Sequence, residues 1–181
     1  AVQGFDVIVD AAIGSGKTST IQHLCAILSA STRILYLTYS GDLKQDITDM
    51  DFADDLPQDS DEERFRKHNR FLRSLKEDTL MIVDNFNATS IQDSFLSVIL
   101  KYRCQILFTT RSRLDGHSCM LLEEISDKTT LLQLAGKFFS DTEEKSDVIE
   151  QIIEAVHAHT LAVELASRLL ETGILEPEML L

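Results

Sequence analysis

The sequence predicts an α/β fold, with a three-layer domain around a five-stranded parallel sheet over residues 1–125 and a small helical subdomain over residues 126–181. In the first part, short unbroken apolar runs alternate with segments of helical period, as in a parallel sheet covered by helices on both faces. From Ser126 onward only the helical period continues. Because the chain begins at Ala1 and ends where a further helical pattern opens at Glu178, we expect it to be part of a longer protein.

The first predicted strand and helix flank a glycine-rich turn. The apolar run 5–9 predicts a buried strand, and residues 18–30 predict a helix whose apolar face carries Ile21, Leu24, Cys25 and Leu28. Between them the segment 11–18, Ala-Ala-Ile-Gly-Ser-Gly-Lys-Thr, fits the pattern G-x-x-x-x-G-K-[ST], with alanine in place of the first glycine.

This pattern between a strand and a helix is a phosphate-binding loop, or P-loop. Backbone N–H groups cradle phosphate oxygens, the lysine reaches the terminal phosphates, and the final hydroxyl binds Mg²⁺. Lys17 is therefore a predicted catalytic residue and Thr18 a predicted magnesium ligand. The residues expected to contact the nucleotide are Ala11, Gly14, Ser15, Gly16, Lys17, Thr18 and Ser19.

A second buried strand is predicted over 33–38, followed by a strongly acidic stretch over 42–63. We expect this stretch to be a solvated loop with at most one helical turn, and a specific cation or partner site is the alternative. The helical period returns over 62–76, with Phe65, Phe71, Leu72 and Leu75 inward. The basic residues expected to face the acidic stretch are Arg64, Arg66, Lys67, Arg70 and Arg73.

The third predicted strand, over 79–85, is an apolar run that ends in an acid. A fully buried strand shows no polar alternation, and its carboxyl end lies where open α/β sheets bind ligands. We predict that Asp84 holds Mg²⁺ from the side opposite Thr18, usually through water.

A helix is predicted over 90–101, with Ile91, Phe95, Val98 and Ile99 inward, and short strands over 104–113 and 119–122 complete the sheet. The strand over 104–113 ends in Thr109, Thr110 and Arg111, so Arg111 can deliver a cation to the γ-phosphate of a nucleotide. The alternative is an arginine that merely lies on the surface after a strand.

The helical subdomain is predicted to contain three helices. Ser126 or Asp127 caps the first, Asp147 with Glu150 resembles a capping pair for a helix over 148–156, and the third begins at Thr160 and stops at Gly173. Two histidines, His157 and His159, lie at the last junction without a carboxylate or cysteine at metal-binding spacing. We interpret them as junction residues, with nucleotide contact as the alternative.

The composition limits which kinds of partner the protein is expected to bind and in which compartment it is expected to work. A formal net charge of −13 argues against nucleic-acid binding through the general surface, although it does not exclude a local basic patch. The cysteines Cys25, Cys104 and Cys119 are odd in number and sit in apolar patterns, which predicts reduced core residues and a cytoplasmic protein. No apolar run reaches the length of a membrane span.

Together these motifs resemble the nucleotide-binding core of the STAND ATPases, in particular the NB-ARC type. The segments that carry the resemblance are the P-loop ending at Thr18, Leu-Met-Ile-Val-Asp-Asn85, Ile-Leu-Phe-Thr-Thr-Arg111, Leu-Leu-Glu-Glu-Ile-Ser126 and His159-Thr-Leu-Ala-Val-Glu-Leu-Ala166. The resemblance implies an ATP/ADP switch with Mg²⁺, in which the helical subdomain closes over the nucleotide and Arg111 senses the γ-phosphate. It also implies nucleotide contacts from His159 and Thr160, contacts with other domains of the longer protein, and nucleotide-dependent self-association.

Two positions depart from that family. Asn85 stands where a second acid usually helps to polarise water, so we expect a slow or absent ATPase activity. Thr160 stands where the family has a proline near the adenine. The alternative functions are a DNA-remodelling or transposition ATPase of the AAA+ type and a small-molecule P-loop kinase, but the sequence offers no arginine-rich lid for the kinase.

Overall fold

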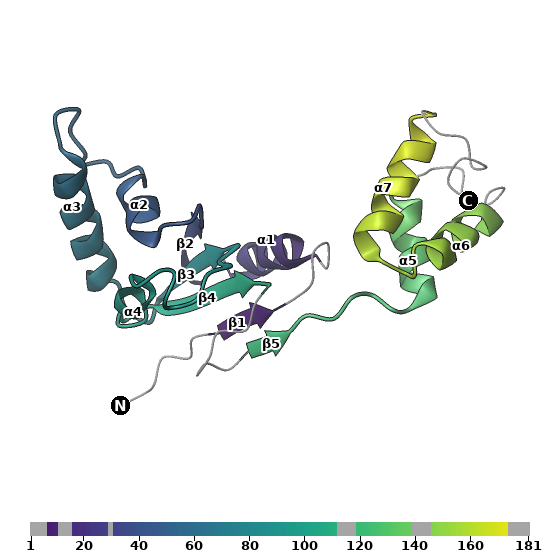
Figure 1. Cartoon of the computed structure of the whole chain (residues 1–181), viewed down its shortest axis with the longest axis horizontal. Helices are drawn as coiled ribbons and strands as arrows, with labels where there is room; N and C mark the ends of the chain where they lie inside the picture. Colours follow the sequence, from purple (N-terminus) through teal and green to yellow (C-terminus); the bar gives the residue numbers. More distant parts are fainter. Residues whose placement is uncertain (1–6, 11–15, 29–30, 112–118, 139–145, 174–181) are drawn as a thin grey trace. The chain divides into compact units, whose positions relative to one another are not determined.

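The computed structural model describes residues 7–10, 16–28, 31–111, 119–138 and 146–173. The described chain divides into two units (Figure 1), a sheet unit within residues 1–11 and 18–121 and a helical unit that groups residues 122–181 with residues 12–17.

All pairings in the sheet are parallel. The described strands are β1 (Val7–Asp10), β2 (Arg33–Thr38), β3 (Thr79–Asp84), β4 (Gln105–Thr110) and β5 (Cys119–Leu121), in the order β2-β3-β4-β1-β5. The prediction of an α/β fold with a parallel sheet is therefore confirmed. The register pairs Thr38 with Asp84 and Asp10 with Thr110, so the carboxyl ends of β1 to β4 meet at one edge.

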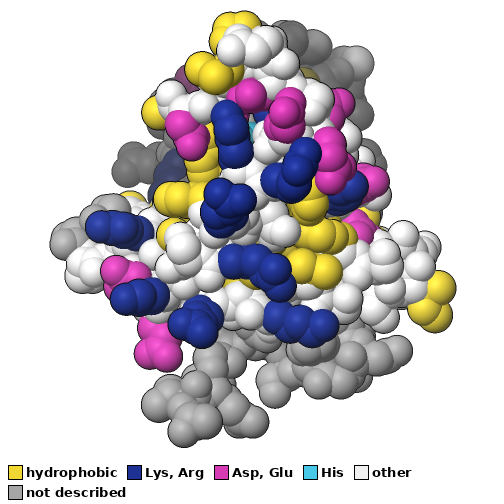
Figure 2. All heavy atoms as spheres, turned by 90° about the vertical axis from the view of Figure 1, so that its left-hand side faces the viewer, with side chains coloured by type: hydrophobic (Ala, Val, Ile, Leu, Met, Phe, Trp, Pro, Cys, Tyr) yellow, Lys and Arg dark blue, Asp and Glu magenta, His cyan; other side chains and the backbone are white. Residues whose placement is uncertain are grey.

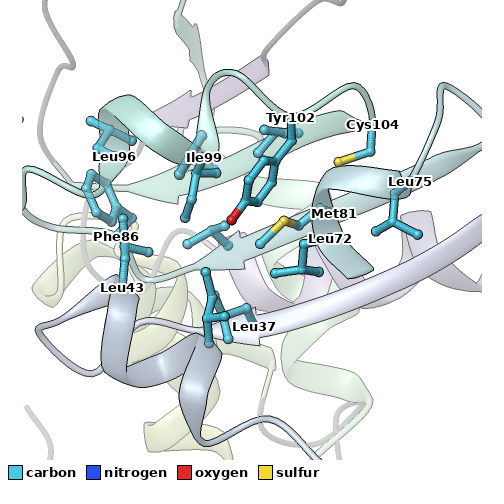
Figure 3. Packing of buried hydrophobic residues seen from close by; sticks show 14 of the residues in the cluster. Leu37, Leu43, Leu72, Leu75, Met81, Phe86, Leu96, Ile99, Tyr102 and Cys104 are labelled. Carbon is cyan, nitrogen blue, oxygen red and sulfur yellow. The ribbon is translucent and has the colours of Figure 1, made fainter. Parts of the chain in front are cut away.

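One face of the sheet is covered by α2 (Leu43–Thr48), α3 (Asp61–Ser74) and α4 (Leu96–Ile99). Met81, Val83, Ile106 and Phe108 point into this core, where they meet buried residues of the three helices (Figure 3). Side chains alternate along a strand, so Tyr36 and Asp84 belong to the opposite face. There Thr18 of α1 (Lys17–Leu28) lies within hydrogen-bonding range of Asp84.

The acidic stretch contains a helix that the sequence interpretation missed. Leu43 and Ile47 of α2 are fully buried, and Asp42 caps the helix by accepting hydrogen bonds from the N–H groups of Lys44 at 2.8 Å and Gln45 at 3.1 Å. The expectation of a solvated loop is therefore wrong for residues 43–48. Two apolar residues four apart, with an N-cap, were enough to dock a short helix despite the surrounding charge.

Of the five basic residues predicted to face the acidic stretch, Arg64 and Lys67 pair with it, whereas the other three, Arg66, Arg70 and Arg73, form no ion pair with a described residue. Lys67 binds Asp59 at 2.6 Å, and Arg64 lies 3.7 Å from Asp55. The expectation that Phe71 faces inward is wrong, because its side chain is 45% exposed and touches Phe52 edge to face. The inward position is taken instead by His68, which is fully buried.

His68 connects the acidic stretch to α2. Its Nδ1 lies 2.7 Å from the carbonyl oxygen of Ile47, and its Nε2 lies 2.8 Å from Oδ1 of Asp55. A backbone carbonyl oxygen can only accept, so Nδ1 donates to Ile47, and Nε2 lies within hydrogen-bonding distance of the Asp55 carboxyl group.

Asp55→Asn is expected to lower the free energy of unfolding at neutral pH. Burial raises the pKa of Asp55, but the hydrogen bonds from His68 and from the N–H of Phe52 lower it by more, so the net shift is downward. A carboxyl group whose pKa is lowered by folding stabilises the protein above its unfolded pKa of about 3.9, and this contribution is lost as the pH falls through the folded value. Urea unfolding at pH 7 and pH 3 checks this, with Asp54→Asn as control. A difference from wild type that does not shrink in acid would contradict it.

The helix predicted over 90–101 is much shorter in the structure, where α4 spans four residues. Ile91, expected inward, is 92% exposed, whereas Ile99 is buried as expected. Asp93 is the reason: its carboxylate accepts hydrogen bonds from the N–H of Leu43 at 2.8 Å and of Phe95 at 3.0 Å. Such side-chain bonds to the backbone compete with helix formation.

The helical unit contains α5 (Lys128–Gly136), α6 (Ser146–Ala155) and α7 (Thr160–Glu171), which share a buried apolar core. Asp127 caps α5 through the N–H of Thr130, and Gly173 follows α7 with φ +65°, so both predicted signals are confirmed. The predicted capping pair is wrong, because α6 begins before Asp147.

The cysteines differ in their surroundings. Cys104 lies in the core and Cys25 is half-buried, but Cys119 is exposed on β5, so the prediction of a core residue is wrong there. β5 is an edge strand with both faces open, which the short apolar run did not reveal. Among the described residues, no helix combines the length and apolar character needed to cross a bilayer.

Candidate nucleotide site

The carboxyl edge of the sheet brings the two sequence motifs together. Asp84 is the last residue of β3, and Thr18 lies in the first turn of α1. The Thr18 hydroxyl oxygen is 3.5 Å from Oδ2 of Asp84, although 66 positions separate them in the chain. The two predicted magnesium ligands are therefore neighbours.

Of the predicted loop, Ala11, Gly14 and Ser15 lie outside the described residues. Gly16 has φ +85°, and a Cβ there would meet nothing within 4 Å, so the backbone conformation alone calls for glycine. Lys17, Thr18 and Ser19 open α1 directly afterwards. The first turn of a helix presents N–H groups without intrahelical partners, which is the usual setting for a phosphate.

Asp84 is held firmly in place. It is 7% exposed, and Oδ1 accepts a hydrogen bond from the Thr109 hydroxyl, while Oδ2 accepts one from the Tyr36 hydroxyl. The Thr109 hydroxyl in turn accepts the N–H of Asn85 at 2.8 Å. These bonds fix the carboxylate as an acceptor directed at the carboxyl edge of the sheet.

Tyr36 is a site residue that the sequence interpretation missed. It lies in β2, and its ring is 43% exposed while its hydroxyl reaches Asp84. Burial of the hydroxyl, and next the hydrogen bond to Asp84, raise the pKa of Tyr36 above its usual value, so it remains a donor. A tyrosine inside an apolar strand carries no motif. Only the register, which pairs Tyr36 with Ile82 two residues before Asp84, reveals its role.

Thr18 and Asp84 fit a magnesium ion. Two adjacent ligands of an octahedral Mg²⁺, each about 2.1 Å from the metal, lie about 3 Å apart, close to the 3.5 Å between these oxygens. Within the described part of the chain, no group of three or more His, Cys, Asp or Glu could hold a metal. The remaining ligands of an ion here would be phosphate and water oxygens, the usual arrangement for Mg²⁺.

Arg111 lies at the same edge, directly after β4. Its Nη2 donates to Oδ1 of Asn85 at 3.1 Å, and its backbone N–H donates to Oδ1 of Asn87 at 2.9 Å. Asn87 closes the network by donating to Oδ1 of Asn85 at 2.7 Å. The guanidinium is thus held beside the residue that follows Asp84, whereas Arg113 lies outside the described residues.

His159 and Thr160 belong to the helical unit. His159 caps α7 through Nδ1, which accepts the N–H of Ala162 at 3.3 Å, and its Nε2 lies 3.7 Å from Oε1 of Glu124. The capping bond supports the interpretation of His159 as a junction residue. The Thr160 hydroxyl oxygen is buried and has no hydrogen-bond partner among the described residues. Contact of either residue with a nucleotide stays a prediction.

Searches of protein families and of curated proteins found no match to this chain. Among solved structures, Cdc6p from Pyrobaculum aerophilum is 14% identical with a TM-score of 0.46, and the match covers 72% of this chain and 42% of Cdc6p. The Thermotoga maritima RuvB Holliday junction branch migration motor is 11% identical with a TM-score of 0.47, and the match covers 96% of this chain and 63% of RuvB. A chain of Drosophila ORC bound to DNA is 13% identical with a TM-score of 0.43, and the match covers 82% of this chain and 43% of the ORC chain. The chain thus spans less than two thirds of each, and likenesses at these scores do not assign it to a family.

Proposed function

We propose that this chain binds ATP and ADP with Mg²⁺ at the carboxyl edge of its sheet and works as a regulatory switch of the STAND or NB-ARC kind. The observation that carries the proposal is the 3.5 Å approach of the Thr18 hydroxyl to the Asp84 carboxylate. It joins a P-loop helix to the acid of a buried strand, which is the pairing that P-loop ATPases use to hold Mg²⁺.

Each residue has a distinct role in this proposal. Lys17 supplies a positive charge to the terminal phosphates, and Thr18 with Asp84 would hold the Mg²⁺, which neutralises phosphate charge when bound. Tyr36 and Thr109 keep Asp84 oriented by donating to its two oxygens. Arg111 is the residue that distinguishes ATP from ADP. Residues 126–181 are the subdomain expected to respond to the nucleotide, and the family resemblance implies contacts from His159 and Thr160.

The same edge explains why turnover should be slow. A base that accepts a proton from the attacking water is expected beside Asp84, but the neighbouring residue is Asn85, whose amide cannot accept a proton at neutral pH. Its Oδ1 is also occupied by donors from Arg111 and Asn87. The arrangement suits a domain that holds ATP rather than one that hydrolyses it rapidly.

We expect phosphate release well below the roughly 1 to 10³ s⁻¹ of typical enzymes. Asn85→Asp should raise the rate at least tenfold, since a positioned base contributes about 10²–10⁴-fold. Gln58→Glu adds the same charge at an exposed position of the acidic stretch and should leave the rate unchanged. A wild-type rate within the typical range would contradict the switch and favour a turnover enzyme, such as a DNA-remodelling ATPase of the AAA+ type.

A further inference from the structure

Exposed basic side chains gather on one side of the sheet unit. They come from α3 and from the segments that lead into β3 and β4. Figure 2 shows this side, with Lys and Arg running across its middle and lower part and acidic side chains mainly along its upper part. We define the basic face by six exposed residues, Arg66, Arg70, Arg73, Lys76, Lys101 and Arg103.

The fold brings these residues together from distant parts of the sequence. Arg66, Arg70 and Arg73 follow helical spacing along one face of α3, opposite the side that buries Leu72. The Tyr102 hydroxyl, on the residue between Lys101 and Arg103, donates to Oδ1 of Asn69 at 2.8 Å. This bond fastens the segment before β4 to the middle of α3.

Arg73 lies close enough to act on Tyr102. Burial, the largest effect, raises the pKa of Tyr102 to about 12, and the positive charge of Arg73 opposes that rise. The face is therefore one continuous surface, with Tyr102 packed beneath it.

The positive charge of this face is not neutralised by the protein. Arg64 and Lys67, on the same helix, are paired with Asp55 and Asp59. By contrast, none of the six residues of the basic face forms an ion pair with another described residue. The acidic residues in the same segments are Glu77 and Asp78 before β3 and Asp61, Glu62 and Glu63 in the first turn of α3, so the excess of positive charge lies beyond that first turn.

We propose that the basic face binds the phosphate backbone of duplex nucleic acid. Cores of protein–protein interfaces are depleted of charged residues, but nucleic-acid interfaces are dominated by Lys and Arg. Four of the six residues are arginine, which grips phosphate in a bidentate manner. At about 1.5 Å per residue, Arg66 to Arg73 spans about 10 Å, enough to meet successive phosphates about 3.4 Å apart along the duplex axis.

The net charge of −13 predicts no binding through the general surface, but it is a sum over the whole chain and does not describe one face. At 0.1 M salt, exposed charges are screened beyond about 10 Å, so acids elsewhere on the molecule oppose binding only weakly. The segments before β3 and β4, which carry Lys76, Lys101 and Arg103, lie at the start of these strands. Asp84 lies at the other end of β3, and a six-residue strand is about 20 Å long. Nucleic acid and nucleotide can therefore bind together, and this inference does not depend on the proposed function.

Fluorescence anisotropy with a labelled 20-base-pair DNA duplex, at several salt concentrations between 50 and 200 mM, tests the inference. We expect a Kd of about 10⁻⁶ to 10⁻⁴ M near physiological salt, without sequence preference. The double variant R70Q/R73Q should bind at least tenfold more weakly at 50 mM salt. Its slope of log K against log salt should be shallower by about 1.8, or about 0.9 for each lost contact.

The variant K128Q/R168Q makes the same change in net charge on the helical unit and should bind the duplex as wild type does. The variant K101Q/R103Q removes charge from the other segment of the face and should weaken binding as R70Q/R73Q does. Three results would overturn the inference: no duplex binding at 50 mM salt, equal weakening by R70Q/R73Q and the control, or tighter binding of a polyglutamate peptide than of the duplex. The last result would assign the face to an acidic protein segment.

Discussion

Arg111→Ala should weaken binding of Mg·ATP roughly 10- to 150-fold, or about 1.5 to 3 kcal/mol, and leave binding of ADP almost unchanged. The guanidinium lies at the carboxyl edge of the sheet, where its Nη2 donates to Oδ1 of Asn85. An amide is a neutral partner, and a γ-phosphate would offer charged oxygens that form stronger bonds with arginine. ADP has no γ-phosphate, so the variant should behave as though locked to ADP.

Calorimetric titration of both nucleotides measures this effect. Arg113→Ala is the matched comparison, because residues two apart point the same way in a strand that continues. We expect only Arg111→Ala to change the ratio of ATP to ADP affinity. If neither variant changes that ratio, this chain holds a nucleotide without sensing its γ-phosphate.

The buried strands and the magnesium ligands could be predicted from the sequence because their signals are local. The strands predicted over 33–38 and 79–85 are short apolar runs, and the structure places them at 33–38 and 79–84. The glycine and hydroxyl pattern before α1 is equally local. An acid that ends a buried parallel strand lies at the carboxyl edge of the sheet, where the P-loop helix also begins, so the approach of Asp84 to Thr18 was expected from the topology.

The features that escaped prediction depend on contacts between distant residues. Asp93 interrupts a helical period because it caps the N–H of Leu43, 50 positions earlier, and no pattern around residue 93 reveals this. In the sequence, Tyr36 looks like one more residue of an apolar strand. Its role follows only from the register, which places it beside the strand that ends in Asp84. The basic face could not be predicted from the net charge, because the net charge of the whole chain is strongly negative.

Lys17→Ala should lower the affinity for Mg·ATP at least tenfold, about 1.4 kcal/mol, because the substitution removes the point charge expected at the terminal phosphates. Lys137→Ala removes an exposed lysine from the helical unit and should bind as wild type does.

Isothermal titration of Mg·ATP into the wild-type chain and the Lys17→Ala variant, both freed of nucleotide beforehand, tests the central claim most directly. We expect saturable binding at one site per chain, weakened at least tenfold by the Lys17 substitution and unaffected by the Lys137 control. No binding by the wild-type chain, or equal affinity in the wild type and Lys17→Ala, would contradict the nucleotide site altogether.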